Sequence, residues 1–167
     1  MEYTVRRART GDVRAIRALI DANAPSGRLL DKATVTLYED IQEFLVAEGP
    51  DGTVAGCGAL HVMWEDLAEI RTVAVDASCR GHGVGHRLVG ALVRNARDVA
   101  VRRVFVLTFE VAFFARHGFG EINGTPVSTE VYAELLRSYD EGVAQFLDLD
   151  RVKPNILGNT RMLLRLE

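Results

Sequence analysis

Hydrophobic and polar residues follow two different spacings along this chain, and each spacing predicts a type of element. Apolar residues recur three or four positions apart, as in helices, at 10–24, 29–40, from the residue after Gly85 to about Ala100, 111–116 and 129–141. Short apolar, β-branched runs predict strands at 3–7, 43–48, 54–62, 67–75, 104–108, after 119 and at 162–166. Turn-forming residues predict a hairpin turn at 49–52 and a loop at 148–159. This order indicates an α/β (α+β) fold with a mixed sheet and helices on both faces.

The most specific pattern lies in residues 69–99, which predict a strand, a glycine-rich turn and a helix. The turn contains Arg80, Gly81, Gly83 and Gly85. Main-chain N–H groups at the start of a helix lack helical acceptors, and with the positive end of the helix dipole they bind phosphate oxygens. Glycine leaves room for the phosphate and permits the dihedral angles that such a site requires. Arg80 adds a cation.

Two common phosphate-binding motifs do not fit this turn. A P-loop requires Gly-Lys-Ser/Thr where this chain has Gly85-His86-Arg87, and the dinucleotide fingerprint requires a third glycine where His86 stands. The spacing Arg80-x-x-Gly83-x-Gly85, after the strand sequence V-A-V-D, resembles the pyrophosphate loop of the GNAT family of N-acetyltransferases. The alternative is a glycine-rich turn that serves only to reverse the chain.

The resemblance to the GNAT family extends over the whole order of elements, which implies a mostly antiparallel sheet of about seven strands. Several segments are most similar to the acetyltransferase domain of bacterial N-acetylglutamate synthases, which are amino-acid N-acetyltransferases: 57–61, 69–76, 104–109, 113–119 and 161–164. The similarity is strongest from about residue 30 to 122. It implies one domain, 1–167, without the amino-acid-kinase-like domain that many members of that group carry.

The resemblance implies acetyl-CoA as co-substrate. The backbone groups of Val73, Ala74 and Val75 are expected to bind the pantetheine arm, and the Val73 N–H to polarise the thioester carbonyl. Phe114, at the position where many relatives have a tyrosine, is also expected to contact the cofactor. The residues expected to bind the diphosphate are Arg80, Gly81, His82, Gly83, Val84, Gly85 and His86.

Transfer of an acetyl group to an amine requires a proton acceptor. Glu69 is the best candidate, acting through a water, because it begins the strand beside the thioester. The alternative is that Glu69 is a solvated charge at the end of a strand. His61 and His117 are weaker candidates, since a single histidine is more often structural.

The leaving group of this reaction lacks the usual proton donor. Many relatives supply a tyrosine hydroxyl where this chain has Phe114. A free thiol has a pKa near ~8.5, so the thiolate can leave without a dedicated acid. Tyr132 and Tyr139 are alternative donors that the pattern does not place.

The resemblance implies L-glutamate as the acceptor, and a dicarboxylate requires fixed cations. Arginine binds a carboxylate with two parallel hydrogen bonds, and lysine acts as a point charge. The candidates for substrate binding are Lys32, Arg71, Lys153, Asn155 and Arg161. For each of them the alternative is an ordinary solvated side chain. Lys32 is favoured because the 20 basic residues include only one other lysine.

Composition excludes several other classes of protein. The formal charge of -3 gives no reason to expect nucleic-acid binding. No apolar run reaches the ~18 residues of a membrane helix, and the N-terminus does not resemble a signal peptide. Cys57 and Cys79 form neither a disulfide framework nor a metal-binding pattern, so we expect no metal and a reducing cytoplasm. Many relatives pair, so a homodimer is among the expected assemblies.

Three functions stay open at this point. The first is glutamate N-acetylation, the opening step of arginine synthesis. The second is acetylation of another small-molecule or protein amine by the same fold. The third is a non-catalytic module that binds acyl-CoA. It is favoured because residue 114 is phenylalanine and not the tyrosine of many relatives.

Overall fold

The computed structural model describes residues 2–23 and 32–167, so the predicted helix at 29–40 is described only from Lys32 onward. The chain divides into two compact units, Met1–His61 with Ile70–Asn95 and Val62–Glu69 with Ala96–Glu167, and each is described by itself. The helices and strands, in chain order, are β1 (Thr4–Arg7), α1 (Val13–Asn23), α2 (Thr34–Glu39), β2 (Phe44–Glu48), β3 (Val54–Trp64), β4 (Leu67–Val75), α3 (Val84–Asp98), β5 (Arg103–Thr108), α4 (Val111–Ala115), β6 (Gly120–Glu121), α5 (Thr129–Leu135), α6 (Glu141–Phe146) and β7 (Thr160–Arg165).

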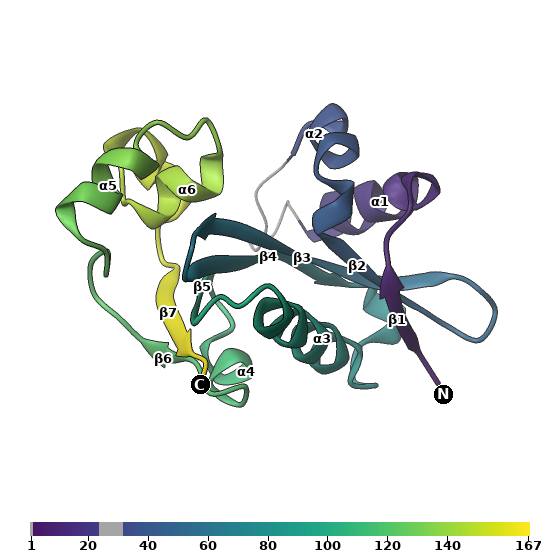
Figure 1. Cartoon of the computed structure of the whole chain (residues 1–167). Coiled ribbons are helices and arrows are strands. Elements are labelled where there is room, and N and C mark those ends of the chain that lie inside the picture. The colour runs from purple at the N-terminus through teal and green to yellow at the C-terminus, as the bar shows by residue number, and fades with distance from the viewer. Residues whose placement is uncertain (1, 24–31) are drawn as a thin grey trace. The chain divides into compact units, whose positions relative to one another are not determined.

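Seven strands form one mixed sheet in the order β1-β2-β3-β4-β5-β7-β6 (Figure 1). β1 pairs with β2, β2 with β3, β5 with β7 and β6 with β7 in antiparallel fashion, whereas β4 and β5 run parallel. Parallel strands need a crossover connection, which is here α3. The predicted mixed, mostly antiparallel sheet is therefore confirmed.

The core of the first unit lies between the sheet and helices α1 and α2. Alternate residues of β2, Phe44 and Val46, pack with Cys57 and Ala59 of β3 and with the apolar face of α1. Within this unit, α1 and α2 lie on one side of the strands and α3 on the other (Figure 1). Cys57 is fully buried, and loss of solvation raises the pKa of its thiol to about 12. This agrees with the prediction that Cys57 is an inert core residue.

Two glycines of β3 let α3 approach the sheet closely. A Cβ at Gly56 would lie 3.0 Å from Leu88 Cδ1 and 3.0 Å from the Ala74 carbonyl oxygen. A Cβ at Gly58 would lie 2.9 Å from Leu92 Cδ1. Both contacts are tighter than side chains normally allow, so these glycines fix how near α3, and hence its N-terminus, lies to β4.

The core of the second unit joins β5 and β7 to α5 and α6. Phe105 and Phe146 meet edge to face, with ring centroids 4.9 Å apart, and Leu163 packs in the same cluster. The helix predicted at 129–141 is present as α5 (Thr129–Leu135), but its predicted end was wrong, because Asp140 caps a separate helix, α6. Its carboxylate accepts a hydrogen bond from the Val143 N–H at 2.9 Å and caps α6. A 3₁₀ helix at Asp150–Asn155 interrupts the predicted loop.

Candidate coenzyme A loop and acceptor residues

The loop between β4 and α3 has the conformation that a phosphate site requires. Gly81 and Gly83 have φ angles of +84° and +79°, a region that glycine enters without strain. A Cβ at either position would meet no protein atom within 4 Å, so the space around both is open. The first turn of α3 leaves the N–H groups of Gly83, Val84 and Gly85 without helical acceptors. These features fit a diphosphate.

Gly85 does not belong to the turn. α3 begins at Val84, so the turn that the sequence placed at three glycines contains only Gly81 and Gly83. The entrance to the loop is fixed locally, because the Asp76 carboxylate accepts hydrogen bonds from the Ser78 N–H at 2.9 Å and from its hydroxyl at 2.6 Å. These bonds lower the pKa of Asp76, which stays ionised at neutral pH.

Arg80 is attached to the end of α1. Its Nη2 donates to Asn23 Oδ1 at 3.2 Å, and the Asn23 amide donates to the Leu19 carbonyl at 2.8 Å. Asn23 is 8% exposed, so a largely buried side chain holds the guanidinium. His82 lies beside Tyr3, with ring centroids 6.5 Å apart. The sequence did not single out Asn23, because this contact spans 57 positions of the chain.

The middle of β4 contains a backbone irregularity. Thr72 has a φ angle of +58°, which is rare for a β-branched residue, and it is buried. Its carbonyl oxygen accepts a hydrogen bond from the Cys57 thiol at 3.4 Å. A left-handed residue in a strand redirects the following peptide out of the regular ladder, and here that peptide carries the Val73 N–H. Backbone strain of this kind is found at functional positions more often than in ordinary strands.

Glu69 is a buried carboxylate in the second unit. It is 3% exposed and lies opposite Phe105 in the parallel pairing of β4 with β5. The alternative that Glu69 is a solvated charge at a strand end is therefore wrong. Of the weaker candidates for the base, His61 Nδ1 pairs with Glu43 at 2.8 Å and His117 lies against the Phe113 ring. The structure thus leaves Glu69 as the strongest candidate.

Phe114 is a buried aromatic residue in a cluster. It meets Phe113 and Phe119 edge to face, with centroids 5.0 and 5.4 Å away, and it offers no proton. Neither predicted alternative donor is favoured by its surroundings. The Tyr132 hydroxyl donates to the Leu147 carbonyl at 3.4 Å, and Tyr139 is 100% exposed. A cofactor contact of Phe114 stays a prediction.

Arg161 has most of its hydrogen-bond donors bound to the backbone. Its Nε and Nη2 donate to the Gly124 carbonyl at 3.2 and 3.0 Å, and its Nη1 donates to the Gln145 carbonyl at 3.0 Å. Nη2 also donates to the Phe146 carbonyl, and the guanidinium lies 5.0 Å from the Phe105 ring centroid. Burial lowers the pKa of Arg161, while the charges of Asp148 and Glu69 oppose this shift. A bidentate carboxylate contact by Arg161 alone is not available in this arrangement.

The other predicted acceptor residues are spread over several elements. Lys153 is an exposed side chain whose ammonium lies 3.4 Å from an Asp150 carboxylate oxygen. The Lys32 carbonyl accepts a hydrogen bond from Arg17, and Arg71 lies partly buried in β4. Asn155 ends the 3₁₀ helix, and its side chain lies outside the described part. Their roles with substrate stay predictions.

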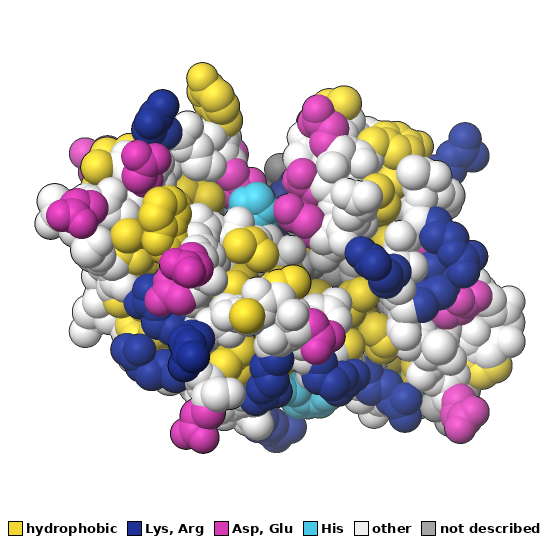
Figure 2. Space-filling view, viewed as in Figure 1, with side chains coloured by type: hydrophobic (Ala, Val, Ile, Leu, Met, Phe, Trp, Pro, Cys, Tyr) yellow, Lys and Arg dark blue, Asp and Glu magenta, His cyan; other side chains and the backbone are white. Residues whose placement is uncertain are grey.

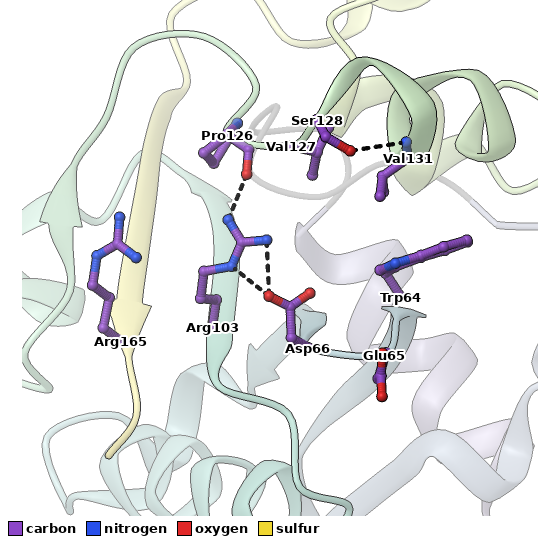
Figure 3. Close-up of a pocket in the computed structure, with 9 residues that line it drawn as sticks. All are labelled: Trp64, Glu65, Asp66, Arg103, Pro126, Val127, Ser128, Val131 and Arg165. Atoms are coloured by element: carbon purple, nitrogen blue, oxygen red, sulfur yellow. Dashed lines mark hydrogen bonds and ion pairs between the residues drawn. The ribbon is translucent and has the colours of Figure 1, made fainter.

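A hollow of about 600 Å³ in the second unit contains no predicted site residue (Figure 3). Arg103 crosses it, bound to Asp66 Oδ2 at 3.2 Å and to the Pro126 carbonyl. The lining residues are Trp64, Glu65, Asp66, Arg103, Pro126, Val127, Ser128, Val131 and Arg165. Because Arg103 is already paired with Asp66, its charge is not available to a substrate carboxylate in this hollow.

Charge and metal-ligand patterns add little within the described residues. Acidic and basic side chains both occur across the face shown in Figure 2, as expected from the small net charge. Residues 2–23 and 32–167 contain no group of three or more His, Cys, Asp or Glu side chains that could hold a metal ion. In the same ranges, no helix has the length and apolar character needed to cross a membrane.

Comparison with known proteins identifies similar chains. An amino-acid acetyltransferase from Mycobacterium tuberculosis is 66% identical over 163 residues, which are 96% of this chain and 92% of that protein. A crystal structure from the same organism, Rv2747 in complex with CoA and NLQ, superposes with a TM-score of 0.96 and 64% identity, covering 98% and 99% of the two chains.

A longer relative is similar over part of its length. Neisseria gonorrhoeae N-acetylglutamate synthase, solved with coenzyme A and N-acetyl-glutamate, has a TM-score of 0.78 and 25% identity. It covers 100% of this chain, which corresponds to 36% of that protein. The model of the acetyltransferase (GNAT) family matches residues 7–119, more than half of the sequence. The strand, loop and helix described above lie within this match, and the chain belongs to the acetyltransferase (GNAT) family.

Proposed function

We propose that this protein is an amino-acid N-acetyltransferase, which transfers the acetyl group of acetyl-CoA to the α-amine of L-glutamate. The observation that carries the proposal is the loop after β4, where Gly81 and Gly83 combine positive φ angles with open space at the start of α3. The relatives named above support the amino-acid acceptor, since one is an amino-acid acetyltransferase and another was solved with N-acetyl-glutamate. This reaction is the first step of arginine synthesis.

The loop and β4 would hold the co-substrate. Main-chain N–H groups of Gly83, Val84 and Gly85 bind diphosphate oxygens, and the positive end of the α3 dipole adds to this attraction. The Val73 N–H, redirected by the irregularity at Thr72, donates to the thioester oxygen and stabilises the negative charge that develops there. A fixed donor of this kind typically contributes about 10²–10³ in rate.

The acetyl transfer is a direct attack. The acceptor nitrogen forms a bond to the acetyl carbon, the carbon–sulfur bond breaks, and the sulfur leaves as a thiolate. Glu69 accepts, through a water, the proton that the amine releases. Its burial keeps this carboxylate away from bulk solvent, beside the strand that would hold the thioester. No acid is required for the thiolate, and Phe114 supplies none.

The test is an acetyl-CoA assay with a panel of amino acids. We expect release of free thiol with glutamate, in equal amount to an N-acetylated product identified by mass spectrometry. Glutamine and aspartate are included because they share the α-carboxylate. Absence of turnover with all three would rule out the proposed acceptor class, and turnover of a peptide or polyamine instead would indicate a different amine.

A non-catalytic module that binds acyl-CoA is the second candidate, favoured by the buried ring of Phe114. It predicts binding of CoA in calorimetry without turnover of any amine. The predicted homodimer and cytoplasmic location are separate questions, which size-exclusion chromatography with light scattering and cell fractionation would answer.

A further inference from the structure

Arg161 is a partly buried cation that no carboxylate contacts within the described residues. A guanidinium carries five N–H hydrogens. The backbone carbonyls of Gly124, Gln145 and Phe146 accept four of them, which leaves one Nη1 hydrogen without an acceptor in the described part. Removal from water disfavours the charged form, and the two acids that oppose this effect act from a distance. An anion in contact with this cation would be stabilised.

Gln145 provides a second unmatched donor on α6. Its side chain is 6% exposed, and its Nε2 has no hydrogen-bond partner within residues 2–23 and 32–167. A buried donor without a partner is costly, and native proteins contain few of them. Val143 and Phe146, on another face of the same helix, pack in the apolar core. The Gln145 amide is therefore not explained by the packing of α6.

The two unmatched donors belong to residues that are in contact through the main chain of Gln145. Arg161 Nη1, the atom that carries the unaccepted hydrogen, lies 3.0 Å from the Gln145 carbonyl oxygen. Arg161 on β7 pairs with Leu107, and Glu69 on β4 pairs with Phe105, so the sheet register places Glu69 and Arg161 on the same face. A neutral donor and a cationic donor together suit the two oxygens of a carboxylate.

We propose that Gln145 Nε2 and Arg161 Nη1 bind one carboxylate of the acceptor amino acid. The inference rests on the proposed function and deepens it, since it makes Gln145 a residue that selects the acceptor. It also replaces the predicted bidentate contact of Arg161 with a contact shared between two side chains. The expected ligand is an amino acid that carries at least one carboxylate in addition to the reacting amine.

The experiment compares Gln145→Met with Gln145→Glu in the full chain. Methionine keeps the length of the side chain but removes the donor, so we expect the KM for glutamate to rise about 10- to 100-fold, as for loss of a hydrogen bond to a charged group. Glutamate at position 145 opposes the ligand charge, so a larger rise is expected. The KM for acetyl-CoA should stay within about twofold of wild type. Glu141→Gln, which removes an exposed acid from the same helix, should change neither constant.

Thermal shift with glutamate alone reads the same contact without turnover. Ligand bound to the native state raises Tm, so wild type should respond and Gln145→Met should respond much less. If Gln145 only fills space, both variants keep the wild-type KM and the full shift, and the inference is overturned. Failure of the proposed function is seen separately, in wild type, as absence of acetylated amino acid.

Discussion

The loop after β4 and the segment between β6 and β7 hold their polar groups in different ways. In the loop, neighbours in sequence set the backbone, since Asp76 binds Ser78 and Gly81 and Gly83 direct the chain, while the Arg80 side chain is held by Asn23 of α1. In the segment, one side chain of the strand that follows it, Arg161, binds the carbonyls of Gly124, Gln145 and Phe146. The first arrangement depends on local conformation, whereas the second depends on a single long-range contact. A substitution at a loop glycine should therefore damage binding of the coenzyme, whereas loss of Arg161 should damage stability.

The largest expected effect is that of Arg161→Met on stability. The change removes four hydrogen bonds that a charged, partly buried donor makes to three backbone carbonyls, although the Asp148 N–H still donates to Gln145 and the Thr125 hydroxyl to Phe146. A hydrogen bond to a charged group contributes about 1.5–3 kcal/mol. We expect the free energy of unfolding to fall by about 3 kcal/mol or more, measured by urea denaturation. Arg151→Gln is the matched control, because Arg151 makes only an exposed pair with Glu141 and should leave the midpoint nearly unchanged. Equal midpoints for the two variants would contradict the role of Arg161 as the central contact.

Glu69→Gln should lower kcat about 100-fold or more, because the amide cannot accept the proton that the amine releases. The KM for acetyl-CoA should hardly change. Glu65→Gln, at an exposed position four residues earlier, is the control. Steady-state rates of the two variants with glutamate, measured under the same conditions as wild type, would check the assignment. A Glu69→Gln enzyme with wild-type kcat would mean that another group takes the proton.

Gly83→Ala should weaken acetyl-CoA about tenfold. Alanine meets no neighbouring atom here, so the cost comes from its positive φ angle, for which strain is about 1–2 kcal/mol. Gly90→Ala in the middle of α3 is the opposite control: it should add about 0.5–1 kcal/mol of stability and leave the Kd for CoA unchanged. Calorimetric titration with CoA measures both. The same Kd for both variants would show that the loop does not bind the coenzyme.

Asn23→Leu should raise the KM for acetyl-CoA several-fold, because Arg80 loses the oxygen that orients it. Asn23→Asp restores an acceptor oxygen and should recover most of the affinity. The exposed neighbour Ala22, changed to Gln, tests for general effects on α1. If Asn23→Asp is as weak as Asn23→Leu while Ala22→Gln is normal, Asn23 acts on the loop by another route.

The smallest effect expected is a difference in thiol labelling. Cys57 is fully buried with its pKa raised to about 12, so it should not react with a disulfide reagent at pH 8. Cys79 lies partly exposed in the loop and should react, more slowly when CoA is bound. One thiol per native chain is expected, and two would contradict the burial of Cys57.

The loop could be predicted from sequence because its chemistry is local, and the acceptor side could not. The glycine spacing after an apolar strand predicted the turn. The one error was Gly85, which lies in α3 because that helix begins at Val84. Arg161 was singled out correctly as unusual, but its backbone partners lie 15 to 37 positions away. Gln145 was not predicted at all, since only the folded chain shows that its donor is unmatched. The burial of Glu69 likewise required the pairing of β4 with β5.

The glycines of β3 make affinity for the coenzyme sensitive to positions that never touch it. Gly56 and Gly58 act as spacers under α3, and a larger side chain at either position forces Leu88 or Leu92 to move and so disturbs the packing of the helix that carries the donors. A genetic screen for weak coenzyme binding should therefore recover substitutions in β3, which does not contact the coenzyme, as well as in the loop. Substitution of Gly56 or Gly58 by alanine would therefore change the affinity for the coenzyme while leaving the sequence of the loop intact.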